Sequence, residues 1–377
     1  MRPNQALNPV AKTVGRTGTL NVLIAPDSFK GSLTSVEVAR AIAAGWSRAR
    51  PRDTIVLSPL ADGGEGTLAA IEAAGGWARE MIRVHDPLGR PIDATYLRAR
   101  DAASAIVEMA QASGLSRVAA ADRDPIAATS VGTGELLAAA IAAGADDVTL
   151  GIGGSATTDG GRGLLEALEA SGLALHEVVL AVACDVTNPL LGPTGAASIF
   201  GPQKGATLDQ VRELDDRNAR WADQLETATS RRERDTPGAG AAGGVGFALL
   251  AIQDRFKSFA LRPGVDLVME ATGFDEKLAT ADLVITGEGR IDAQTAFGKT
   301  ALGVARRAQA AGVPCIAVGG GVEPEGIEAL AAVGAIAVPV TERPQTIEEA
   351  IAAGAAPIER CAERIARLTD SLTKSHD

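Results

Sequence analysis

Charged and polar residues follow short apolar runs at several places, where the strands of a parallel sheet would end. They are Asp27, Ser28 and Lys30; Asp62 and Glu65; Asp185 and Asn188; and Glu288, Arg290 and Asp292. Ligands of open α/β sheets bind beyond the carboxyl ends of the strands. Carboxylates can hold Mg²⁺ or accept a proton, and Lys and Arg can hold phosphate oxygens, so the set indicates phosphoryl transfer. Any single acid here is as readily explained as a helix cap or a turn residue.

Glycines surround nearly all of these positions. They are Gly31, Gly63, Gly64, Gly66, Gly153, Gly154, Gly160, Gly161, Gly287 and Gly289. Glycine lets a backbone approach a ligand closely and direct N–H groups at an anion. The uncharged segment 238–244, which contains Gly243 and Gly244, precedes an apolar helix predicted at 245–252. It can serve a nucleotide or close helix packing, and the sequence favours packing.

Two further motifs fit only in part. Residues 151–156 read Gly-Ile-Gly-Gly-Ser-Ala after a predicted strand, which is formally G-x-G-x-x-A. A dinucleotide fingerprint also needs an acid about 20 residues on, and the next predicted strand ends only at Asp185. Because the motif still matches in part, an NAD(P)-dependent dehydrogenase of a small hydroxy acid remains as an alternative. Residues 298–300 read Gly-Lys-Thr, but Ala293 stands where a P-loop needs glycine.

Composition excludes several classes of protein. Of the 377 residues, 47 are acidic and 36 basic, giving a formal net charge of −11. Such a surface repels nucleic-acid backbones and anionic lipids. The three cysteines lie far apart and form no metal-binding or disulfide pattern. No apolar run approaches the roughly 18 residues of a membrane helix. We expect a cytoplasmic enzyme with small-molecule substrates and neither nucleic-acid nor membrane partners.

The elements that position these residues alternate at both ends of the chain. Apolar runs at 22–25 and 54–60 and helical periodicity at 34–48 predict a parallel sheet with helices on its faces. Short strands at 79–84, 92–98 and 104–109 predict a mixed or antiparallel region. Further strands are predicted at 147–150, 178–183, 283–286 and 314–318, and further helices at 134–143, 161–170, 207–226, 299–310 and 347–368.

This order predicts one α/β fold divided into two domains. A doubly wound parallel-sheet domain is formed by residues 20–78 together with 276–377. A second, mixed α/β domain, residues 79–275, is inserted in the middle of the chain. Residues 1–19 lack apolar periodicity and predict a flexible N-terminal extension.

The chain resembles the type-1 glycerate kinase family. The resemblance is carried by 25–32 (APDSFKGS), 61–67 (ADGGEGT), 151–161 (GIGGSATTDGG), 183–189 (ACDVTNP), 200–205 (FGPQKG), 237–244 (PGAGAAGG) and 286–292 (TGEGRID). It runs from about Val22 to about Gly320. Segments this long, in this order, are specific.

The resemblance implies a Rossmann-like domain with an inserted domain and an active site in the cleft. It also implies D-glycerate and ATP as substrates, Mg²⁺ as cofactor and, as in bacterial members, 2-phosphoglycerate as product. A relative that binds ligand without turning it over is a third hypothesis. Whether the protein is a monomer or a homodimer stays open.

Roles are assigned by motif position and chemistry. As catalytic residues we expect Asp62, Asp185, Lys30 and Arg290, the last binding the glycerate carboxylate through its planar guanidinium. The substrate-binding candidates are Asp27, Ser28, Asn188, Arg290 and Asp292. The nucleotide or phosphate candidates are Gly153, Gly154, Ser155, Lys204, Gly243, Gly244 and Lys299. The metal candidates are Asp62, Asp185 and Glu288.

Two features depart from the family pattern. The family usually has Asn where this chain has Thr158, which offers a shorter side chain with one hydroxyl. The family also carries some two dozen more residues between the helix ending near Gly172 and the strand at Val178, where only 173–177 remain. Surface connections tolerate such shortening.

Overall fold

The computed structural model describes residues 18–100, 103–293, 295 and 300–374. These residues form two compact units, one built from two separate segments of the chain and the other from the segment between them. Unit 1 comprises residues up to Ala61 and from Met269 onward, and unit 2 comprises Asp62–Val268. These limits differ from the domain limits predicted at 78/79 and 275/276. The predicted extension lies outside the described residues except for Gly18 and Thr19.

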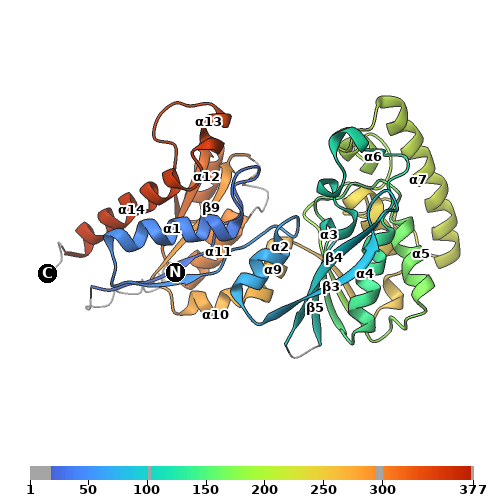
Figure 1. Cartoon of the computed structure of the whole chain (residues 1–377), viewed down its shortest axis with the longest axis horizontal. Coiled ribbons are helices and arrows are strands. Elements are labelled where there is room, and N and C mark those ends of the chain that lie inside the picture. The colour runs from blue at the N-terminus through green and yellow to red at the C-terminus, as the bar shows by residue number, and fades with distance from the viewer. Residues whose placement is uncertain (1–17, 101–102, 294, 296–299, 375–377) are drawn as a thin grey trace, which may run out of the picture. The chain divides into compact units, whose positions relative to one another are not determined.

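Unit 1 contains a parallel sheet (Figure 1). Its order among the described residues is β11-β10-β9-β1-β2. The strands are β1 (Asn21–Ile24), β2 (Thr54–Leu57), β9 (Leu283–Ile291), β10 (Cys315–Val322) and β11 (Ala335–Pro339). From β1 the chain adds β2 toward one edge of the sheet, and from β9 it adds β10 and β11 toward the opposite edge. The boundary between β1 and β9 is therefore a topological switch point, where open α/β sheets bind ligands.

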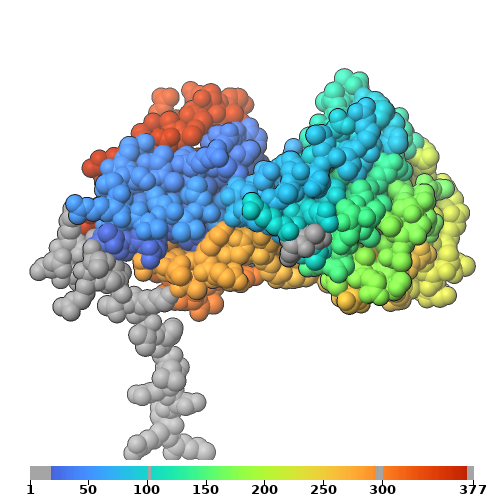
Figure 2. All heavy atoms as spheres, turned by 60° about the horizontal axis from the view of Figure 1, so that its bottom comes forward, coloured from blue at the N-terminus to red at the C-terminus, as the bar shows by residue number. Residues whose placement is uncertain are grey.

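Helices cover both faces of this sheet, which confirms the doubly wound prediction. On β1 and β9, Val22, Ile24 and Ile285 pack against α1 (Ser35–Ala49) and α14 (Ala356–Lys374). The intervening Leu23 and Val284 are also buried and point to the opposite face. There α11 (Thr300–Ala311) packs on β9 and β10. In Figure 2 the red C-terminal atoms adjoin the blue atoms of the N-terminal part.

Two predicted elements of unit 1 are corrected by the structure. The helix predicted at 347–368 is two helices, α13 (Ile347–Ala352) and α14. They are separated at Gly354, whose φ of 57° lies in the left-handed region. The strand predicted at 283–286 continues to Ile291, because β10 remains paired to it through Ile291↔Val322. The other helices of unit 1 are α10 (Phe274–Ala279) and α12 (Pro324–Ala331).

Unit 2 contains a mixed sheet with the order β3-β4-β5-β6-β7-β8 among its described residues. Its strands are β3 (Trp77–His85), β4 (Pro91–Ala99), β5 (Ser104–Glu108), β6 (Asp147–Gly151), β7 (Val179–Ala183) and β8 (Ser258–Arg262). The first three pair antiparallel, as predicted, and the remaining pairs are parallel. The carboxyl ends of β5, β6 and β7 consequently lie along one edge.

The helices of unit 2 pack on this sheet around an aliphatic core. They are α2 (Thr67–Ala74), α3 (Ala110–Ser113), α4 (Val131–Ala142), α5 (Arg162–Ser171), α6 (Ala196–Phe200), α7 (Leu208–Thr229), α8 (Val245–Ala251) and α9 (Gly264–Thr272), whose last residues belong to unit 1. Val107, Val148 and Leu180 from neighbouring strands belong to one buried cluster with residues of α4, α5 and α8. Within the described residues, no helix is long and apolar enough to cross a membrane.

Candidate functional site

The glycine-rich loop 62–66 lies on the strand ends of unit 2. A Cβ built on Gly63 would come within 2.4 Å of the Ala183 Cβ at the end of β7. A Cβ built on Gly153, just beyond β6, would lie 2.5 Å from the Gly64 Cα. Side chains at these glycines would therefore separate the loop from the sheet. Glycine here allows two backbones to meet at the edge where ligands bind.

Asp62 and Asp185 border the same helix start. Asp185 Oδ1 accepts a hydrogen bond from the N–H of Gly264, the first residue of α9, at 2.9 Å. A Cβ on Gly264 would lie 2.0 Å from the carbonyl oxygen of Asp62. Asp62 Oδ1 accepts from the N–H of Gly64 at 3.2 Å. The structure thus brings two of the predicted acids together, and Asp185 is exposed.

The two glycine segments predicted for phosphate or packing lie against each other. A Cβ on Gly243 would lie 1.9 Å from the Thr157 carbonyl oxygen, and one on Gly244 would lie 2.5 Å from the Gly160 Cα. The N–H of Gly160 donates to the Gly243 carbonyl at 2.9 Å. Close packing of two backbones is a sufficient physical reason for these glycines. Their assignment to a nucleotide stays a prediction.

Lys204 is buried beneath the loop 151–161. Its side chain comes from the turn after α6, is 2% exposed, and donates to Ser155 Oγ at 2.9 Å and to the Thr157 carbonyl at 2.5 Å. Burial lowers the pKa of Lys204 to about 7, and the carboxylate of Asp159 acts in the opposite direction. Lys204 thus ties the turn after α6 to this loop.

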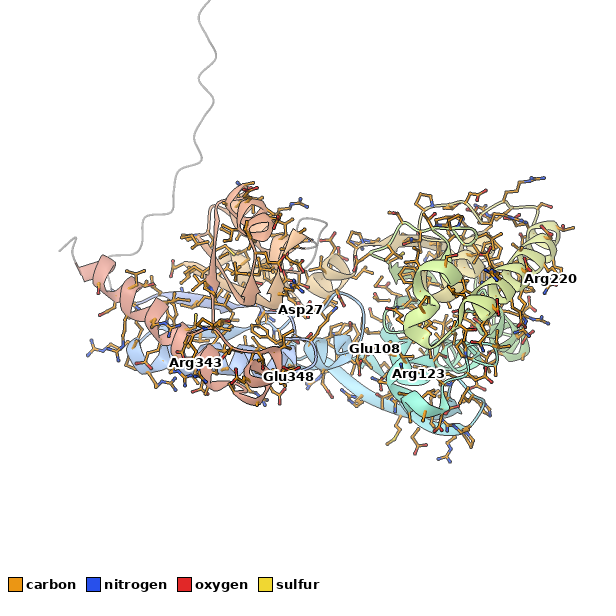
Figure 3. All side chains as sticks on the ribbon, turned by 90° about the horizontal axis from the view of Figure 1, so that it is seen from above. Asp27, Glu108, Arg123, Arg220, Arg343 and Glu348 are labelled. Carbon is orange, nitrogen blue, oxygen red and sulfur yellow. The ribbon has the colours of Figure 1, made fainter. Side chains whose placement is uncertain are left out.

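A buried carboxylate absent from the sequence prediction lies on the same edge. Glu108, which is labelled in Figure 3, is the last residue of β5, and its side chain is fully buried. Its Oε1 accepts from the Gly66 N–H at 3.2 Å and its Oε2 from the Leu68 N–H at 3.1 Å. Burial raises the pKa of Glu108 to about 7, although these hydrogen bonds oppose the shift. The available signal was an acid ending the apolar run 105–107.

In unit 1 the loop after β1 runs along the extension of β9. The N–H of Asp27 donates to the Gly287 carbonyl at 2.8 Å. A Cβ on Gly289 would lie 3.3 Å from the Lys30 nitrogen, so the loop passes close to the strand. This is the switch point between β1 and β9, and Lys30 is exposed there.

The two buried acids at the switch point are each held by a threonine. Asp27 Oδ2 accepts from Thr300 Oγ1 at 2.7 Å, and Glu288 Oε1 accepts from Thr295 Oγ1 at 3.0 Å. The Asp27 Oδ1 also accepts from the N–H of Ser28 at 2.6 Å. Thr300 lies 273 residues from Asp27 in the sequence, so sequence reasoning missed this partner.

Arg290 has a partner that the sequence did not indicate. Its Nε donates to Glu323 Oε1 at 3.0 Å, its Nη2 contacts the same oxygen, and Asp292 lies 3.5 Å from Nε. Glu323 follows β10, the neighbour of β9, so sheet pairing brings the two together. The side chain of Arg290 is 65% exposed, and two carboxylates orient its guanidinium.

Two predicted positions remain, Asn188 and Lys299, together with Thr158, where the chain departs from the family pattern. Asn188 donates through Nδ2 to the Thr194 carbonyl at 2.9 Å, within its own loop. The buried hydroxyl of Thr158 has no hydrogen-bond partner among the described residues. Lys299 lies outside the described residues.

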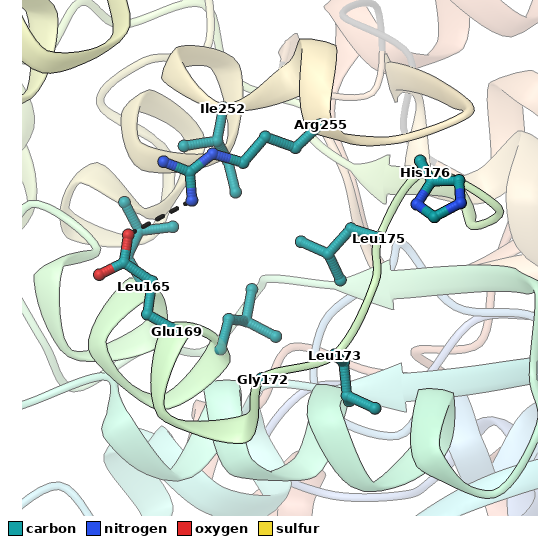
Figure 4. Close-up of a pocket in the computed structure, with 9 residues that line it drawn as sticks. Leu165, Glu169, Gly172, Leu173, Leu175, His176, Ile252 and Arg255 are labelled. Carbon is teal, nitrogen blue, oxygen red and sulfur yellow. Dashed lines mark hydrogen bonds and ion pairs between the residues drawn. The ribbon is translucent and has the colours of Figure 1, made fainter.

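The shortened connection after α5 lines a small hollow that has both leucine and charged side chains in its wall (Figure 4). Leu173 and Leu175 pack onto the core of unit 2, facing Ile252. An ion pair between Arg255 and Glu169, 3.3 Å long, borders the hollow. Two of the five remaining residues therefore still cover the core.

The acids of unit 2 suit a hard cation such as Mg²⁺. Asp62 and Asp185 both offer carboxylate oxygens at a strand edge, and Mg²⁺ at nucleotide sites uses one or two carboxylates with phosphate oxygens. Among the described residues there is no group of three acids, histidines or cysteines that would form an all-protein metal site. The donor set thus fits a metal shared with a phosphate ligand.

Comparisons with known proteins find similar chains over most of this sequence. The family model for glycerate kinases matches residues 22–177 and 170–370, two stretches that meet at the short connection. A glycerate kinase of Halalkalibacterium halodurans is 43% identical over 94% of this chain and 99% of its own length. The glycerate 2-kinase of Escherichia coli K12 is 43% identical over 80% of this chain and 85% of its length.

A solved structure is similar over nearly the whole chain. It is the crystal structure of a "putative glycerate kinase 2" from Salmonella typhimurium LT2, with a TM-score of 0.79 and 39% identity. The match covers 94% of this chain and all of the other. The predicted fold class is thereby confirmed.

Proposed function

The chain belongs to the glycerate kinase family, and from this premise we propose that it transfers the γ-phosphoryl group of ATP to the 2-hydroxyl of D-glycerate. The products are then 2-phosphoglycerate and ADP. That it is an enzyme, a kinase, follows from the family and its relatives. The choice of the 2-hydroxyl is supported by the similarity to the protein named glycerate 2-kinase.

The observation that carries this proposal is the shared position of Asp62 and Asp185 at the start of α9. Two carboxylates beside closely packed glycine loops provide what phosphoryl transfer needs, namely a proton acceptor or metal ligand next to backbone N–H groups. The chemistry itself is mostly positioning and charge stabilisation.

Each unit has its own part of the proposed machinery. In unit 2, Asp62 and Asp185 accept the proton of the substrate hydroxyl or hold the metal, and the loop 151–155 binds phosphate oxygens. Lys204, which is buried against Ser155, supports that loop, and we assign it to the phosphate side of the site. When bound, Mg²⁺ would supply neutralisation of the charge on the transferred phosphate.

In unit 1, exposed cations are proposed to bind the anionic parts of the substrates. Arg290, oriented by Glu323 and Asp292, presents a planar guanidinium that suits a carboxylate. Lys30 is exposed beside the strand that carries Arg290, and we assign it to a phosphate. Asp27 and Ser28 are assigned to the hydroxyl groups of glycerate.

A substrate comparison tests the proposal. Purified protein is given ATP and Mg²⁺ with D-glycerate, L-glycerate, D-lactate or no acid, and ADP formation is followed. The proposal predicts ADP only with D-glycerate, and activity that disappears with EDTA and returns with added Mg²⁺. ADP formation equal in all four mixtures would contradict it. Reduction of NAD(P) by a hydroxy acid without ATP would favour the dehydrogenase alternative.

A further inference from the structure

We propose that Glu108 is a positioning residue for the reaction: its buried carboxylate holds the loop 62–66 on the strand ends of unit 2 and so sets the direction of Asp62. The inference rests on the proposed function, because it assigns a cause to the placement of a residue in that site. Because Glu108 is fully buried, its proposed role is to act through the loop.

Glu108 contacts the start of α2. The N-cap position of this helix is Gly66, which has a φ of 96° and provides no side-chain cap. The N–H groups of Gly66 and Leu68 instead donate to the two oxygens of Glu108, one to each. A carboxylate also suits a helix N-terminus electrostatically. The cap of α2 therefore comes from β5, about forty residues away in the chain.

Hydrogen bonds within the loop connect this cap to Asp62. Thr67 Oγ1 donates to the Gly64 carbonyl at 2.7 Å, and the Gly64 N–H donates to Asp62 Oδ1 at 3.2 Å. Gly64 thus links the first turn of α2 to the carboxylate of Asp62 through two hydrogen bonds. Moving the Gly66 end would move the Asp62 end.

Charged and polar side chains surround the carboxylate of Glu108. Glu65 is a like charge that disfavours the ionised form, whereas Arg79 interacts with Glu108 attractively and Gln111 donates a hydrogen bond. Among the residues that the structure describes, no ion pair to Glu108 is found at hydrogen-bond distance. Burying a carboxylate in this way is costly for a fold, and an apolar residue would pack in a strand more favourably. Its presence is explained by what the two N–H groups require.

The test compares two substitutions of neighbouring buried residues. Glu108→Gln keeps size but leaves one loop N–H facing an amide NH₂ group, which cannot accept it. Val107→Ala, on the same strand, removes packing without touching the loop contacts and is the control for lost stability. We expect Glu108→Gln to lower kcat about tenfold and Val107→Ala to leave it within about twofold. Equal losses of kcat in the two variants would overturn the proposal.

A double-mutant cycle separates positioning of Asp62 from a general structural effect. If Glu108 acts through Asp62, Glu108→Gln lowers kcat by about tenfold in the wild-type background and by less than about twofold in an Asp62→Asn background. The same factor in both backgrounds would overturn the proposal. Glu108→Asp, which keeps the carboxylate, should recover part of the lost kcat.

Hydrogen exchange provides a readout that does not depend on turnover. The peptide spanning 62–70 should exchange about tenfold faster in Glu108→Gln, with little change in the same peptide of Val107→Ala. Unchanged exchange in Glu108→Gln would show that the carboxylate does not hold the loop. If the wild-type protein formed no ADP with glycerate, the proposed function would fail, and the exchange result would still decide whether Glu108 holds the loop.

Discussion

Asp185 and Asp62 meet at a single residue: Asp185 accepts the N–H of Gly264, and the carbonyl of Asp62 lies where a Gly264 side chain would be. The start of α9 is thus capped by Asp185, and only a glycine at position 264 lets it pass this close to the backbone of Asp62. Because Asp185 has both a capping contact and an exposed carboxylate, its structural and catalytic roles can be separated by substitution.

Asp185→Asn should lower kcat at least about 100-fold, because the amide cannot accept a proton or hold a metal as the carboxylate does. Asn is also a good helix cap, so the contact to Gly264 should persist. We expect the free energy of unfolding to change by less than about 1 kcal/mol. Steady-state kinetics and urea unfolding of the same preparation check both parts. A variant with near-normal turnover would remove Asp185 from the machinery.

Lys30→Ala should lower kcat/KM for ATP by at least about tenfold with little effect on unfolding, because the side chain is exposed beside β9. The exposed Lys257, which is outside the proposed site, is the matched control. Lys257→Ala should leave the kinetics of the enzyme unchanged. Equal losses in the two variants would indicate a general charge effect.

Arg290→Lys should raise KM for glycerate about tenfold and leave KM for ATP nearly unchanged, since lysine keeps the charge but loses the planar fork. Glu323→Gln keeps an acceptor oxygen but removes the negative charge that orients the guanidinium, and it should raise KM for glycerate less strongly. Measuring both KM values in each variant checks this. A selective rise of KM for ATP would move Arg290 to the nucleotide.

The burial of Lys204 predicts that the folded protein becomes more stable as the pH rises above 7. The pKa of Lys204 is lowered to about 7 in the folded protein. In the unfolded chain the side chain is hydrated and has its ordinary pKa of 10.5. Between these values the unfolded chain binds the extra proton, so the free energy of unfolding rises with pH from about 7 to about 10.5. Below pH 7 the cost of burying the charge is fully present. Lys204→Met should abolish this rise, as urea unfolding at pH 7, 8 and 9 would reveal.

Gly243→Ala should lower the free energy of unfolding by about 2 kcal/mol or more, because a Cβ would collide with the Thr157 carbonyl. Gly172 is the matched control: its φ of 65° is similar to the 70° of Gly243, but nothing lies within 4 Å of its added Cβ. Gly172→Ala should cost only the backbone strain, about 1 kcal/mol. Equal costs would show that the two glycine loops are not closely packed.

The predictable part of this site is the part encoded locally. Asp27, Asp62 and Asp185 each follow an apolar run and have glycines nearby, so periodicity and turn chemistry place them at strand ends. The same rule applied to the run ending at Glu108 would have found the buried carboxylate. Its burial could not be anticipated, because it depends on a loop some forty residues earlier in the chain.

Contacts between distant segments were beyond sequence reasoning. Thr300 reaches Asp27 across 273 residues, and Glu323 meets Arg290 only because β10 pairs with β9. The break between α13 and α14 was missed because helical periodicity continues across it, while the backbone turns at Gly354. Local patterns specify elements, whereas partner choice follows from the topology of the sheet.

The most direct test of the central claim is to identify the product by coupling the reaction to enolase. Protein with ATP, Mg²⁺ and D-glycerate should form ADP and, with enolase present, phosphoenolpyruvate without delay and in equal amount, because enolase uses 2-phosphoglycerate. ADP with no enolase signal until a phosphoglycerate mutase is added would place the phosphoryl group on the 3-hydroxyl and contradict the account.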